Sequence, residues 1–403
     1  MSWVGYNGNT DFPIENLPFG IFHLKTENEK NSRVGVAIGD FVIDMQKLFL
    51  VNDNSKNKCF TSSTLNEFIS NGYEYWKYIR ELLLRYLETN IALKYMKNVS
   101  KALIPMSKVL MCMPVNIKNY TDFNSSIHHA KNIGRLYRPT NPLFLNWLMM
   151  PIGYNGRCSS IVVSKTEIKR PSGQFVENGE LKFGKTKKLD FELEIGAIIG
   201  KSSDLGTPIS IDNAHEYIFG FVLLNDWSAR DIQSFECQPL GPLNGKNFAT
   251  TISPWIISTF ALEEFRTKNY EQKMESIDYL KESKENSAKS MYDIDLEILI
   301  NDKILLKSNS KYLYWSFAQQ ITHLTSNGCN IQVGDLIGSG TISGPSHEQC
   351  GSLLEYTLDG SKPFIMNNSE QTFLQDKDVV TMRGYCSGNG YKIGFGKCEG
   401  QIC

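Results

Sequence analysis

Two glutamates and an aspartate in the segment 188–250 have the spacing of a cation site. Glu192 and Glu194 alternate in the run KLDFELEIGAII, so an extended strand would point both toward one face. The apolar run 195–199 that follows predicts that this strand enters a core. By themselves the two glutamates also fit the solvent-exposed face of a strand. A second apolar run, FGFVLLND, ends in Asp226, and buried carboxylates repel one another unless a cation lies between them, so the three together favour an oxygen site for Ca²⁺ or Mg²⁺.

Groups that could move a proton or hold negative charge lie on both sides of this segment. Asp122 and His129 are seven residues apart in NYTDFNSSIHHAKNIGRLYRP and would lie one above the other if this segment were helical. Arg230 and Gln233, three apart in WSARDIQ, would be neighbours on one helical turn. The complete candidate set comprises Asp122, Glu192, Glu194, Asp226, His129, Glu355, Arg230, Gln233 and Lys246.

These residue types together fit the hydrolysis of a carbonyl compound. A hard cation on oxygen ligands binds paired substrate oxygens and stabilises the negative charge that develops on them. A histidine oriented by a carboxylate can deprotonate water near neutral pH. Water attack would then release the leaving group as a metal-bound enolate. The spacing leaves one alternative open, which is a structural calcium site with unrelated charges nearby.

The composition of the chain sets limits on its class and location. Its 403 residues are enough for a large core and two domains, and a formal net charge of −1 gives no field that would attract nucleic acid or an anionic membrane. No run approaches ~18 uninterrupted apolar residues, and the stretch MSWVGYNGNTDF lacks the basic start and apolar core of a secretory signal. The nine cysteines are scattered, odd in number and without a CxxC pair. We therefore expect a soluble protein of a reducing compartment, the cytoplasm.

Residues 1–114 are expected to form a separate N-terminal module. The run RVGVAIGDFVIDM contains two alternating apolar stretches joined at positions 39–40 by Gly-Asp, which predicts a β-hairpin. The spacing from Thr64 to Glu67 is that of a capping box, and residues 73–98 have the periodicity of a helix. Nothing in this module indicates chemistry, so we expect it to support the second one.

Residues 115–403 are expected to form the second module. IDLEILI alternates as a strand, GYCSGNGY predicts a C-terminal hairpin, and residues 312–325 have helical periodicity. The charged segment 267–292 predicts a partly mobile surface insertion. The absence of βαβ alternation, GxSxG, GxxxxGK[ST] and a dinucleotide-binding glycine pattern argues against nicotinamide enzymes, serine hydrolases and phosphate-loop proteins. The expected fold class is mainly β (α+β).

Motifs along nearly the whole chain resemble those of the fumarylacetoacetate hydrolase family. They are DFPIENLPFGIF, RVGVAIGD, YTDF, MPIGYNGR, LDFELE, NDWSARDIQ, LGP…GK…TT, SGTISGP and GYKIGFGKC, of which LDFELE and NDWSARDIQ are highly specific. The resemblance implies a small N-terminal SH3-like β-barrel followed by a mixed β-sandwich roll that forms a homodimer. It also implies hydrolysis of the C–C bond of fumarylacetoacetate to fumarate and acetoacetate, the last step of tyrosine and phenylalanine degradation.

The resemblance also implies roles for single residues. The calcium ligands would be Asp122, Glu192, Glu194 and Asp226. The base would be His129, paired with Glu355, and the groups around the developing oxyanion would be Arg230, Gln233 and Lys246. Lys246 and Thr250 match positions near a second ion of the Mg²⁺ type, where we expect the backbone carbonyl of Lys246 as ligand because an ammonium has no lone pair. The substrate-contacting positions would be Asn124, Arg138, Gln233, Cys237 and Thr341.

At two substrate positions this chain departs from the family pattern. Asn124 and Cys237 stand where the family has tyrosine. Asparagine still donates a hydrogen bond, over a shorter reach, whereas a thiol is a weak donor, so we expect a kept reaction type and a changed substrate preference. Two alternatives stay open: an acylpyruvate hydrolase or oxaloacetate decarboxylase, and a metal-binding homologue without turnover. The long N-terminal module argues against the first, and the intact His129 and Glu355 argue against the second.

Overall fold

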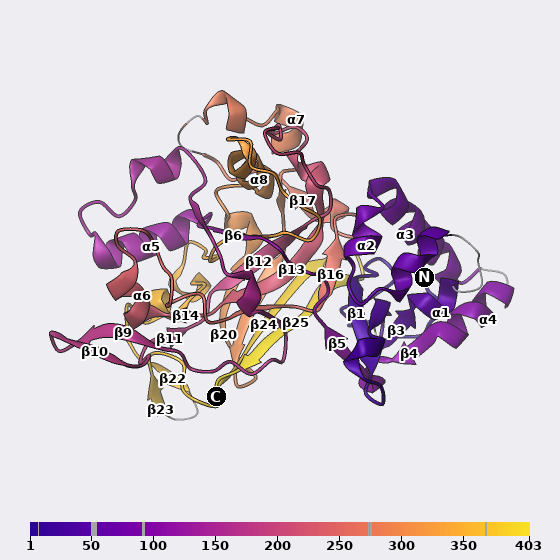
Figure 1. Ribbon diagram of the computed structural model, residues 1–403, viewed down its shortest axis with the longest axis horizontal. Coiled ribbons are helices and arrows are strands. Elements are labelled where there is room, and N and C mark those ends of the chain that lie inside the picture. Colours follow the sequence, from indigo (N-terminus) through magenta and orange to yellow (C-terminus); the bar gives the residue numbers. More distant parts are fainter. Residues whose placement is uncertain (7, 50–54, 91–92, 273, 275, 367–368) are drawn as a thin grey trace.

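The computed structural model of the protein describes residues 1–403 except 7, 50–54, 91–92, 273, 275 and 367–368 (Figure 1). A smaller N-terminal part, indigo to purple in Figure 1, lies against a larger body formed by the rest of the chain. One sheet runs through both parts. Over the described residues it has thirteen strands in the main order β4-β3-β2-β1-β16-β13-β12-β21-β6-β7, with β5, β8 and β15 paired alongside. No helix in the described ranges is long and apolar enough to cross a bilayer. The prediction of a mainly β, α+β fold is confirmed.

The N-terminal part combines short strands with helices. Its strands are β1 (Phe19–Leu24), β2 (Arg33–Ile38), β3 (Phe41–Asp44), β4 (Leu103–Pro105) and β5 (Val109–Cys112). Its helices are α1 (Met45–Phe49), α2 (Asn66–Ser70), α3 (Tyr73–Leu87) and α4 (Leu93–Ala102). The hairpin predicted from RVGVAIGDFVIDM is confirmed, because β2 and β3 pair antiparallel with Ile38 opposite Phe41.

The prediction of one helix over residues 73–98 is wrong. Helix α3 ends at Leu87, and Glu88 takes an extended backbone with φ −65° and ψ 145°. The chain then resumes as α4, and Tyr86 stacks on Tyr95 with ring centroids 5.0 Å apart. The apolar periodicity persists across the break because the two helices pack against each other.

Two other helix starts also differ from the prediction. Thr64 does not cap α2, which begins at Asn66 without a side-chain cap. In the segment 312–325, helix α8 (Phe317–Thr325) begins later than predicted, because Ser316 forms its N-cap as part of a capping box. A cap is decided by backbone conformation as well as by residue type, which spacing alone does not reveal.

The body contributes the strands of the large sheet that carry the candidate site. They are β6 (Tyr120–Phe123), β7 (Gly153–Asn155), β8 (Ile161–Val163), β12 (Leu193–Ile199), β13 (Ile218–Asp226), β15 (Thr250–Ile252), β16 (Trp255–Ser258) and β21 (Leu336–Gly338). Strand β12 pairs antiparallel with β13 and with β21, and β21 pairs parallel with β6. Residues far apart in the sequence are therefore neighbours across four adjacent strands.

A second sheet covers the large one. It has the order β20-β19-β24-β25, formed by β19 (Asp295–Ile300), β20 (Lys303–Asn309), β24 (Val379–Ser387) and β25 (Lys392–Gln401). The predicted strand IDLEILI and the predicted C-terminal hairpin are both confirmed. Phe221 and Leu223 of β13 share one buried core with Leu296 and Met382 of the second sheet, as in a β-sandwich.

Shorter elements surround the two sheets. The small strands are β9 (Ser172–Glu177), β10 (Glu180–Lys185), β11 (Leu189–Asp190), β14 (Ser228–Ala229), β17 (Arg266–Thr267), β18 (Met291–Tyr292), β22 (Phe364–Met366) and β23 (Ser369–Gln371). The helices are α5 (Ile127–Tyr137), α6 (Arg230–Glu236), α7 (Lys284–Ser287) and α9 (Leu353–Tyr356). The segment 267–292, predicted as a surface insertion, is anchored by Leu280, which is fully buried in a cluster with Trp147 and Trp315.

Candidate active site and metal centre

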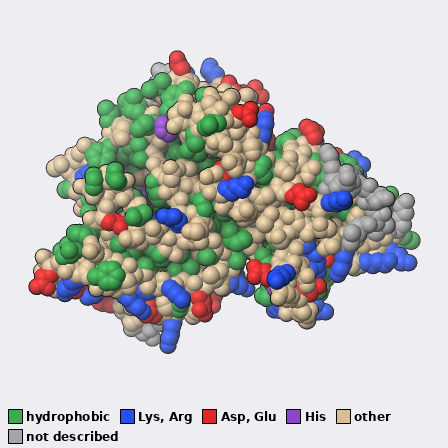
Figure 2. All heavy atoms as spheres, in the orientation of Figure 1, with side chains coloured by type: hydrophobic (Ala, Val, Ile, Leu, Met, Phe, Trp, Pro, Cys, Tyr) green, Lys and Arg blue, Asp and Glu red, His purple; other side chains and the backbone are tan. Residues whose placement is uncertain are grey.

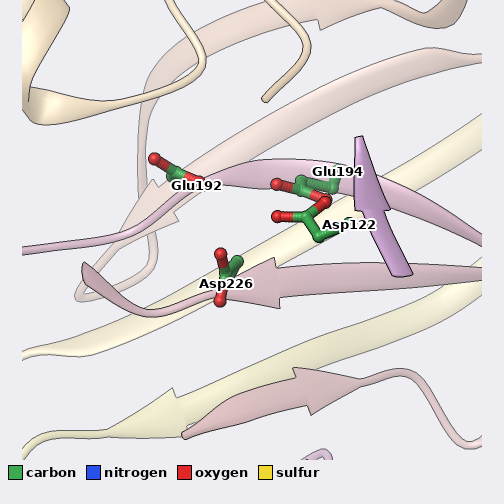
Figure 3. A group of neighbouring side chains, drawn as sticks. All are labelled: Asp122, Glu192, Glu194 and Asp226. Carbon is green, nitrogen blue, oxygen red and sulfur yellow. The ribbon is translucent and has the colours of Figure 1, made fainter. Parts of the chain in front are cut away.

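Four buried carboxylates from neighbouring strands meet within the large sheet (Figure 3). They are Asp122 on β6, Glu192 just before β12, Glu194 on β12 and Asp226 at the end of β13. One oxygen of each lies within 4.8 Å of the others. The prediction that Glu192 and Glu194 point to the same side is therefore confirmed, although Glu192 lies just outside the strand, and the prediction that Asp226 ends a second strand is confirmed.

Gly338 lets these carboxylates approach one another. Strand β21 lies between β6 and β12, and Gly338 is opposite both Asp122 and Gly196. A Cβ at Gly338 would lie 2.7 Å from Asp122 Oδ1 and 3.1 Å from Glu194 Oε2. The missing side chain therefore provides the room in which the two acidic groups meet.

Burial and mutual repulsion make this carboxylate cluster unfavourable without a cation. Burial, followed by the neighbouring carboxylates, raises the pKa of Asp122 and of Glu194 well above the usual values. Asp122 Oδ1 and Glu194 Oε1 are buried and have no hydrogen-bond partner among the described residues. Oxygen atoms of this kind are the ligands that Ca²⁺ and Mg²⁺ prefer, so the residues fit a divalent cation.

Lys246 places its ammonium group between two of the carboxylates. Its Nζ donates to Glu192 and to Asp226, the latter at 2.6 Å, and Asp226 also accepts from Thr250 Oγ1 at 3.3 Å. Burial acts to lower the pKa of Lys246, but Asp226 and Glu192 raise it overall. Burial acts to raise the pKa of Glu192, but Lys246 and Arg230 lower it overall. The lysine is therefore held in its charged form beside the cluster.

Tyr154 is a site residue that reasoning from the sequence missed. It lies on β7 and donates its hydroxyl hydrogen to Asp226 Oδ2 at 3.0 Å, across 72 positions of sequence. A cavity of about 100 Å³ lies at this point, lined by Tyr154, Asp226, Lys246 and Thr250 among others. The signal was the motif MPIGYNGR, but nothing local in that motif says which residue its tyrosine contacts.

His129 and Glu355 form a hydrogen-bonded pair. His129 Nδ1 lies 2.8 Å from Glu355 Oε2, and both side chains are buried. Three further donors hold the carboxylate at 2.8–2.9 Å: Asn132 Nδ2, Ser343 Oγ and Ser352 Oγ. Burial acts to raise the pKa of Glu355, but His129, Asn132 and Ser343 lower it overall. The charged carboxylate therefore orients the ring, and Nε2 is left as the nitrogen that can accept a proton.

The expected stacking of Asp122 and His129 on one helix is wrong. Asp122 lies on β6, which ends at Phe123. Helix α5 begins only at Ile127, after Ser126, whose Oγ accepts a hydrogen bond from His129 N. The two groups therefore come from different elements, a strand and the first turn of a helix.

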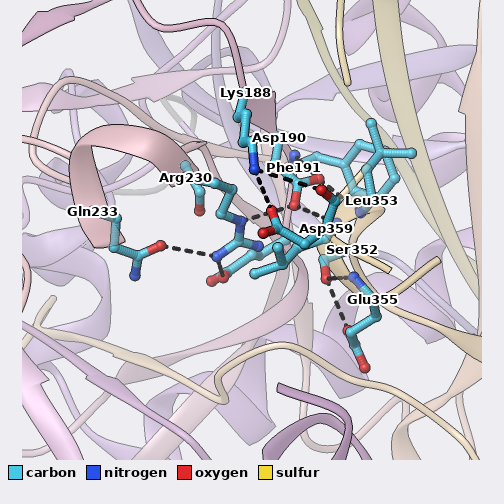
Figure 4. A network of polar contacts seen from close by, with 12 residues as sticks. Lys188, Asp190, Phe191, Arg230, Gln233, Ser352, Leu353, Glu355 and Asp359 are labelled. Atoms are coloured by element: carbon cyan, nitrogen blue, oxygen red, sulfur yellow. Dashed lines mark hydrogen bonds and ion pairs between the residues drawn. The ribbon is translucent and has the colours of Figure 1, made fainter. Parts of the chain in front are cut away.

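Arg230 connects the carboxylate cluster with Asp190 (Figure 4). Its Nε donates to Asp190 Oδ2 at 2.8 Å, and its Nη1 donates to Glu192 Oε1 at 2.6 Å and to Gln233 Oε1 at 3.1 Å. The predicted neighbours Arg230 and Gln233 do lie on one turn of α6. Reasoning from the sequence missed Asp190, although it continues the alternation of Glu192 and Glu194 within LDFELE.

The predicted substrate positions are not equivalent in the structure. Asn124 Oδ1, Arg138 Nε and Thr341 Oγ1 are buried atoms without hydrogen-bond partners over the described ranges, as expected of groups that receive a polar ligand. Arg138 Cζ lies 4.4 Å from the ring centroid of Phe144, which holds the guanidinium in place. Cys237 differs, because it follows α6 as a half-buried residue and its Sγ contacts a carbonyl of its own helix at 3.9 Å.

Comparisons with known proteins cover the whole chain. The family model described as "Fumarylacetoacetase N-terminal" matches residues 15–114, and "Fumarylacetoacetate (FAA) hydrolase C-terminal" matches residues 118–403. Fumarylacetoacetases are 44% identical in Arabidopsis thaliana, 45% in Dictyostelium discoideum and 43% in Homo sapiens. Each match covers 100% of this chain and 97–98% of the relative.

Solved structures share the fold. A fumarylacetoacetate hydrolase from Exiguobacterium antarcticum superposes with a TM-score of 0.56 at 18% identity, covering 96% of this chain and 99% of that one. A maleylpyruvate hydrolase from Sphingobium gives a TM-score of 0.53 at 16% identity with the same coverage. From the family-model matches and the full-length identities, this chain belongs to the fumarylacetoacetate hydrolase family.

Proposed function

We propose that the protein hydrolyses the C–C bond of fumarylacetoacetate and so produces fumarate and acetoacetate. The proposal depends above all on two neighbouring buried groups, the His129–Glu355 pair and a four-carboxylate cluster that Arg230 contacts. His129 is near enough to the cluster to help lower the pKa of Glu192, after Lys246 and Arg230. Curated fumarylacetoacetases that are 41–45% identical over the full length support the same substrate.

His129 takes a proton from the attacking water. Glu355 accepts the hydrogen bond of Nδ1–H, so Nε2 is the basic nitrogen, and the carboxylate stabilises the imidazolium that forms. The water oxygen adds to the carbonyl carbon on the fumaryl side, and the C–C bond to the neighbouring CH₂ group breaks. The electron pair of that bond stays with the acetoacetate part, whose carbon then takes up a proton. One water molecule is consumed, and two carboxylate products leave.

Donors on the other side of the site stabilise the negative charge of this step. Arg230 Nη2 is buried and has no partner in the part of the chain that the structure describes, so it is available to a substrate oxygen. Lys246 is held in its charged form, and Gln233 accepts from Arg230 with its Oε1 while its amide nitrogen has no partner among the residues that the structure describes. In a buried site, fixed donors of this kind stabilise developing charge strongly, because they need no reorganisation.

We assign Ca²⁺ to the four carboxylates and Mg²⁺ to a second position near the Lys246 carbonyl and Thr250. The candidate ligands at the first position are all carboxylate oxygens, and two of these oxygens have no hydrogen-bond partner among the described residues, which supports a hard divalent cation there. Such a cation, when bound, would hold paired substrate oxygens and stabilise negative charge on them. The proposed substrate contacts are Asn124, Arg138, Gln233, Cys237 and Thr341.

We further propose a division into domains 1–114 and 115–403 and a homodimer. The two family models, which match 15–114 and 118–403, support this division.

The β9–β10 hairpin supports the association of two copies, because Val176, Leu181 and Phe183 are 52%, 58% and 76% exposed. Figure 2 shows hydrophobic side chains on the left of the view, where this hairpin lies. Exposed apolar groups gathered in this way are typical of contact surfaces between proteins.

The proposed location is the cytoplasm, and the only partner proposed besides a second copy is the small-molecule substrate. All nine cysteines are free thiols, as in a reducing compartment. The net charge of −1 gives no support to a nucleic-acid or membrane partner.

The proposed function is tested by the loss of fumarylacetoacetate absorbance with purified protein, with added Ca²⁺ and with EDTA. We expect turnover that EDTA abolishes and that His129→Ala lowers by ~10²–10⁴-fold. His128→Ala is the matched control, because His128 is the adjacent histidine and lies 3.4 Å from the Tyr270 hydroxyl outside the catalytic set. Folded, Ca²⁺-loaded wild type that leaves fumarylacetoacetate intact contradicts the proposal and directs the assay to smaller diketo acids.

A further inference from the structure

We propose that Asp190 is a positioning residue, which fixes the His129–Glu355 pair relative to the guanidinium of Arg230. The inference rests on the proposed hydrolysis, because it assigns a role within that reaction. Figure 4 shows Asp190 between Arg230 and the segment of α9 that carries Glu355. Asp190 touches neither His129 nor the carboxylate of Glu355 by a hydrogen bond among the described residues, and so it acts through other groups.

Both carboxylate oxygens of Asp190 are fully occupied by donors. Its side chain is 0% exposed. Oδ2 accepts from Arg230 Nε at 2.8 Å and from Leu354 N at 2.9 Å. Oδ1 accepts from Leu353 N at 2.7 Å and from Phe191 N at 2.8 Å. A carboxylate held by this many short bonds has one orientation, so the groups that donate to it are fixed relative to one another.

The first arm of this arrangement runs through Arg230. Asp190 holds Nε and Glu192 holds Nη1, so two contacts define the plane of the guanidinium. The remaining nitrogen, Nη2, is buried and has no partner over the described ranges. Asp190 and Glu192 together therefore determine where this free donor points.

The second arm runs through the first turn of α9. Leu353 and Leu354, whose N–H groups bind Asp190, directly precede Glu355. Ser352, the N-cap of this turn, accepts from Glu355 N and donates to the Glu355 carboxylate at 2.9 Å. Since Glu355 binds His129 Nδ1 directly, the orientation of the His129 ring depends on this turn. A displacement of about 1 Å in such a site can cost ~10²-fold in rate.

A buried aspartate in the N-terminal part, Asp44, serves as a control for a purely structural role of Asp190. Asp44 is also 0% exposed, and it accepts from Arg33 Nε at 2.9 Å and from Lys47 N at 3.1 Å. It thus reproduces the buried aspartate, the arginine Nε contact and a backbone donor, outside the candidate site. Asp44→Asn should affect stability and leave kcat and KM unchanged.

The decisive variant is Asp190→Asn. The amide fills the same space but removes the negative charge that faces Arg230 and replaces one accepting oxygen with an NH₂ donor. In either orientation the NH₂ group faces a backbone N–H of the first turn of α9, that of Leu353 or that of Leu354, so this turn must shift. We expect kcat for fumarylacetoacetate to fall about 10–100-fold, KM to change less than about threefold, and Tm to fall by no more than in Asp44→Asn. If Asp190→Asn does not fold, Asp190→Ser replaces it, with the same expected loss of kcat.

Two double-mutant cycles test the two arms separately. The first cycle combines Asp190→Asn with Arg230→Gln, and the second combines Asp190→Asn with Glu355→Gln. In each double mutant, the fold-loss of kcat should be smaller than the product of the two single fold-losses, because both changes disturb the same arrangement. The proposal is overturned if the kcat loss of either double mutant equals the product of the two single losses. It is also overturned if kcat in Asp190→Asn is no lower than in Asp44→Asn. Wild type without activity would instead contradict the proposed function, so the two failures are distinguishable.

Discussion

Glu355 Oε2 lies 2.8 Å from His129 Nδ1, although 226 positions separate the two residues in the chain. Helix α5 carries the histidine and the short α9 carries the glutamate, and both side chains are buried. The pair therefore presents one oriented basic nitrogen to the site, which is the arrangement that general-base catalysis needs.

The charge of Glu355 should contribute to the decrease of the free energy of unfolding at acid pH. Its folded-state pKa lies below the ordinary value of 4.5, so its contribution is fully present above about pH 4.5 and is lost as pH falls through the folded-state pKa. We expect the free energy of unfolding to fall less steeply below about pH 4.5 in Glu355→Gln than in wild type. Urea unfolding between about pH 3 and 6 measures this, and parallel curves would count against the lowered pKa.

Removing one carboxylate from the cluster should separate metal binding from stability. Glu194 is buried with Oε1 unpartnered and a raised pKa, so Glu194→Gln should raise the Tm of the EDTA-treated protein by relieving repulsion. The same change should abolish the Tm increase that Ca²⁺ gives to wild type, because bound metal stabilises only the folded state. Glu297→Gln is the control that should keep the Ca²⁺ response, because it removes a buried carboxylate that binds Lys307 Nζ at 3.0 Å on β19, outside the cluster. An unaltered Ca²⁺ response in Glu194→Gln would remove Glu194 from the ligand set.

A single methyl group at Gly338 should weaken the metal site. In Gly338→Ala, the Cβ would lie 2.7 Å from Asp122 Oδ1, so the carboxylate must move. We expect Ca²⁺ affinity, measured by calorimetry, to fall at least about tenfold, which is a loss of ~1.4 kcal/mol. Gly184→Ala is the control, because a Cβ there would be 4.0 Å from its nearest neighbour, Phe175. Equal Ca²⁺ affinity in both variants would show that the close packing at Gly338 is unimportant.

Tyrosine at positions 124 and 237 should increase activity on fumarylacetoacetate. Asn124 Oδ1 is buried without a partner in the described part of the chain, and Cys237 is a weak donor. One hydrogen bond to a charged ligand is worth ~1.5–3 kcal/mol, so Asn124→Tyr with Cys237→Tyr should raise kcat/KM about tenfold or more. The corresponding phenylalanine variants isolate the hydroxyl, since they fill the same space. If tyrosine and phenylalanine variants match wild type, these positions do not contact the substrate.

Local rules explain the parts of the site that the sequence predicted. Strand periodicity is a property of adjacent residues, so the common direction of Glu192 and Glu194 could be predicted from LDFELE, although Glu192 itself lies just before β12. The end of an apolar strand at Asp226, and the helical turn that joins Arg230 to Gln233, follow from equally local patterns. Family resemblance supplied the pairing of His129 with Glu355, which spacing alone does not contain.

Tertiary structure decided which of these local pieces meet. Asp122 approaches Glu194 only because β21 lies between β6 and β12 and has glycine at position 338. In the same way, Asp190 binds the backbone of Leu353 across 163 positions, and Tyr154 reaches Asp226 across 72. Strand order and side-chain contact over such separations depend on how the whole chain packs, and no local periodicity carries that information.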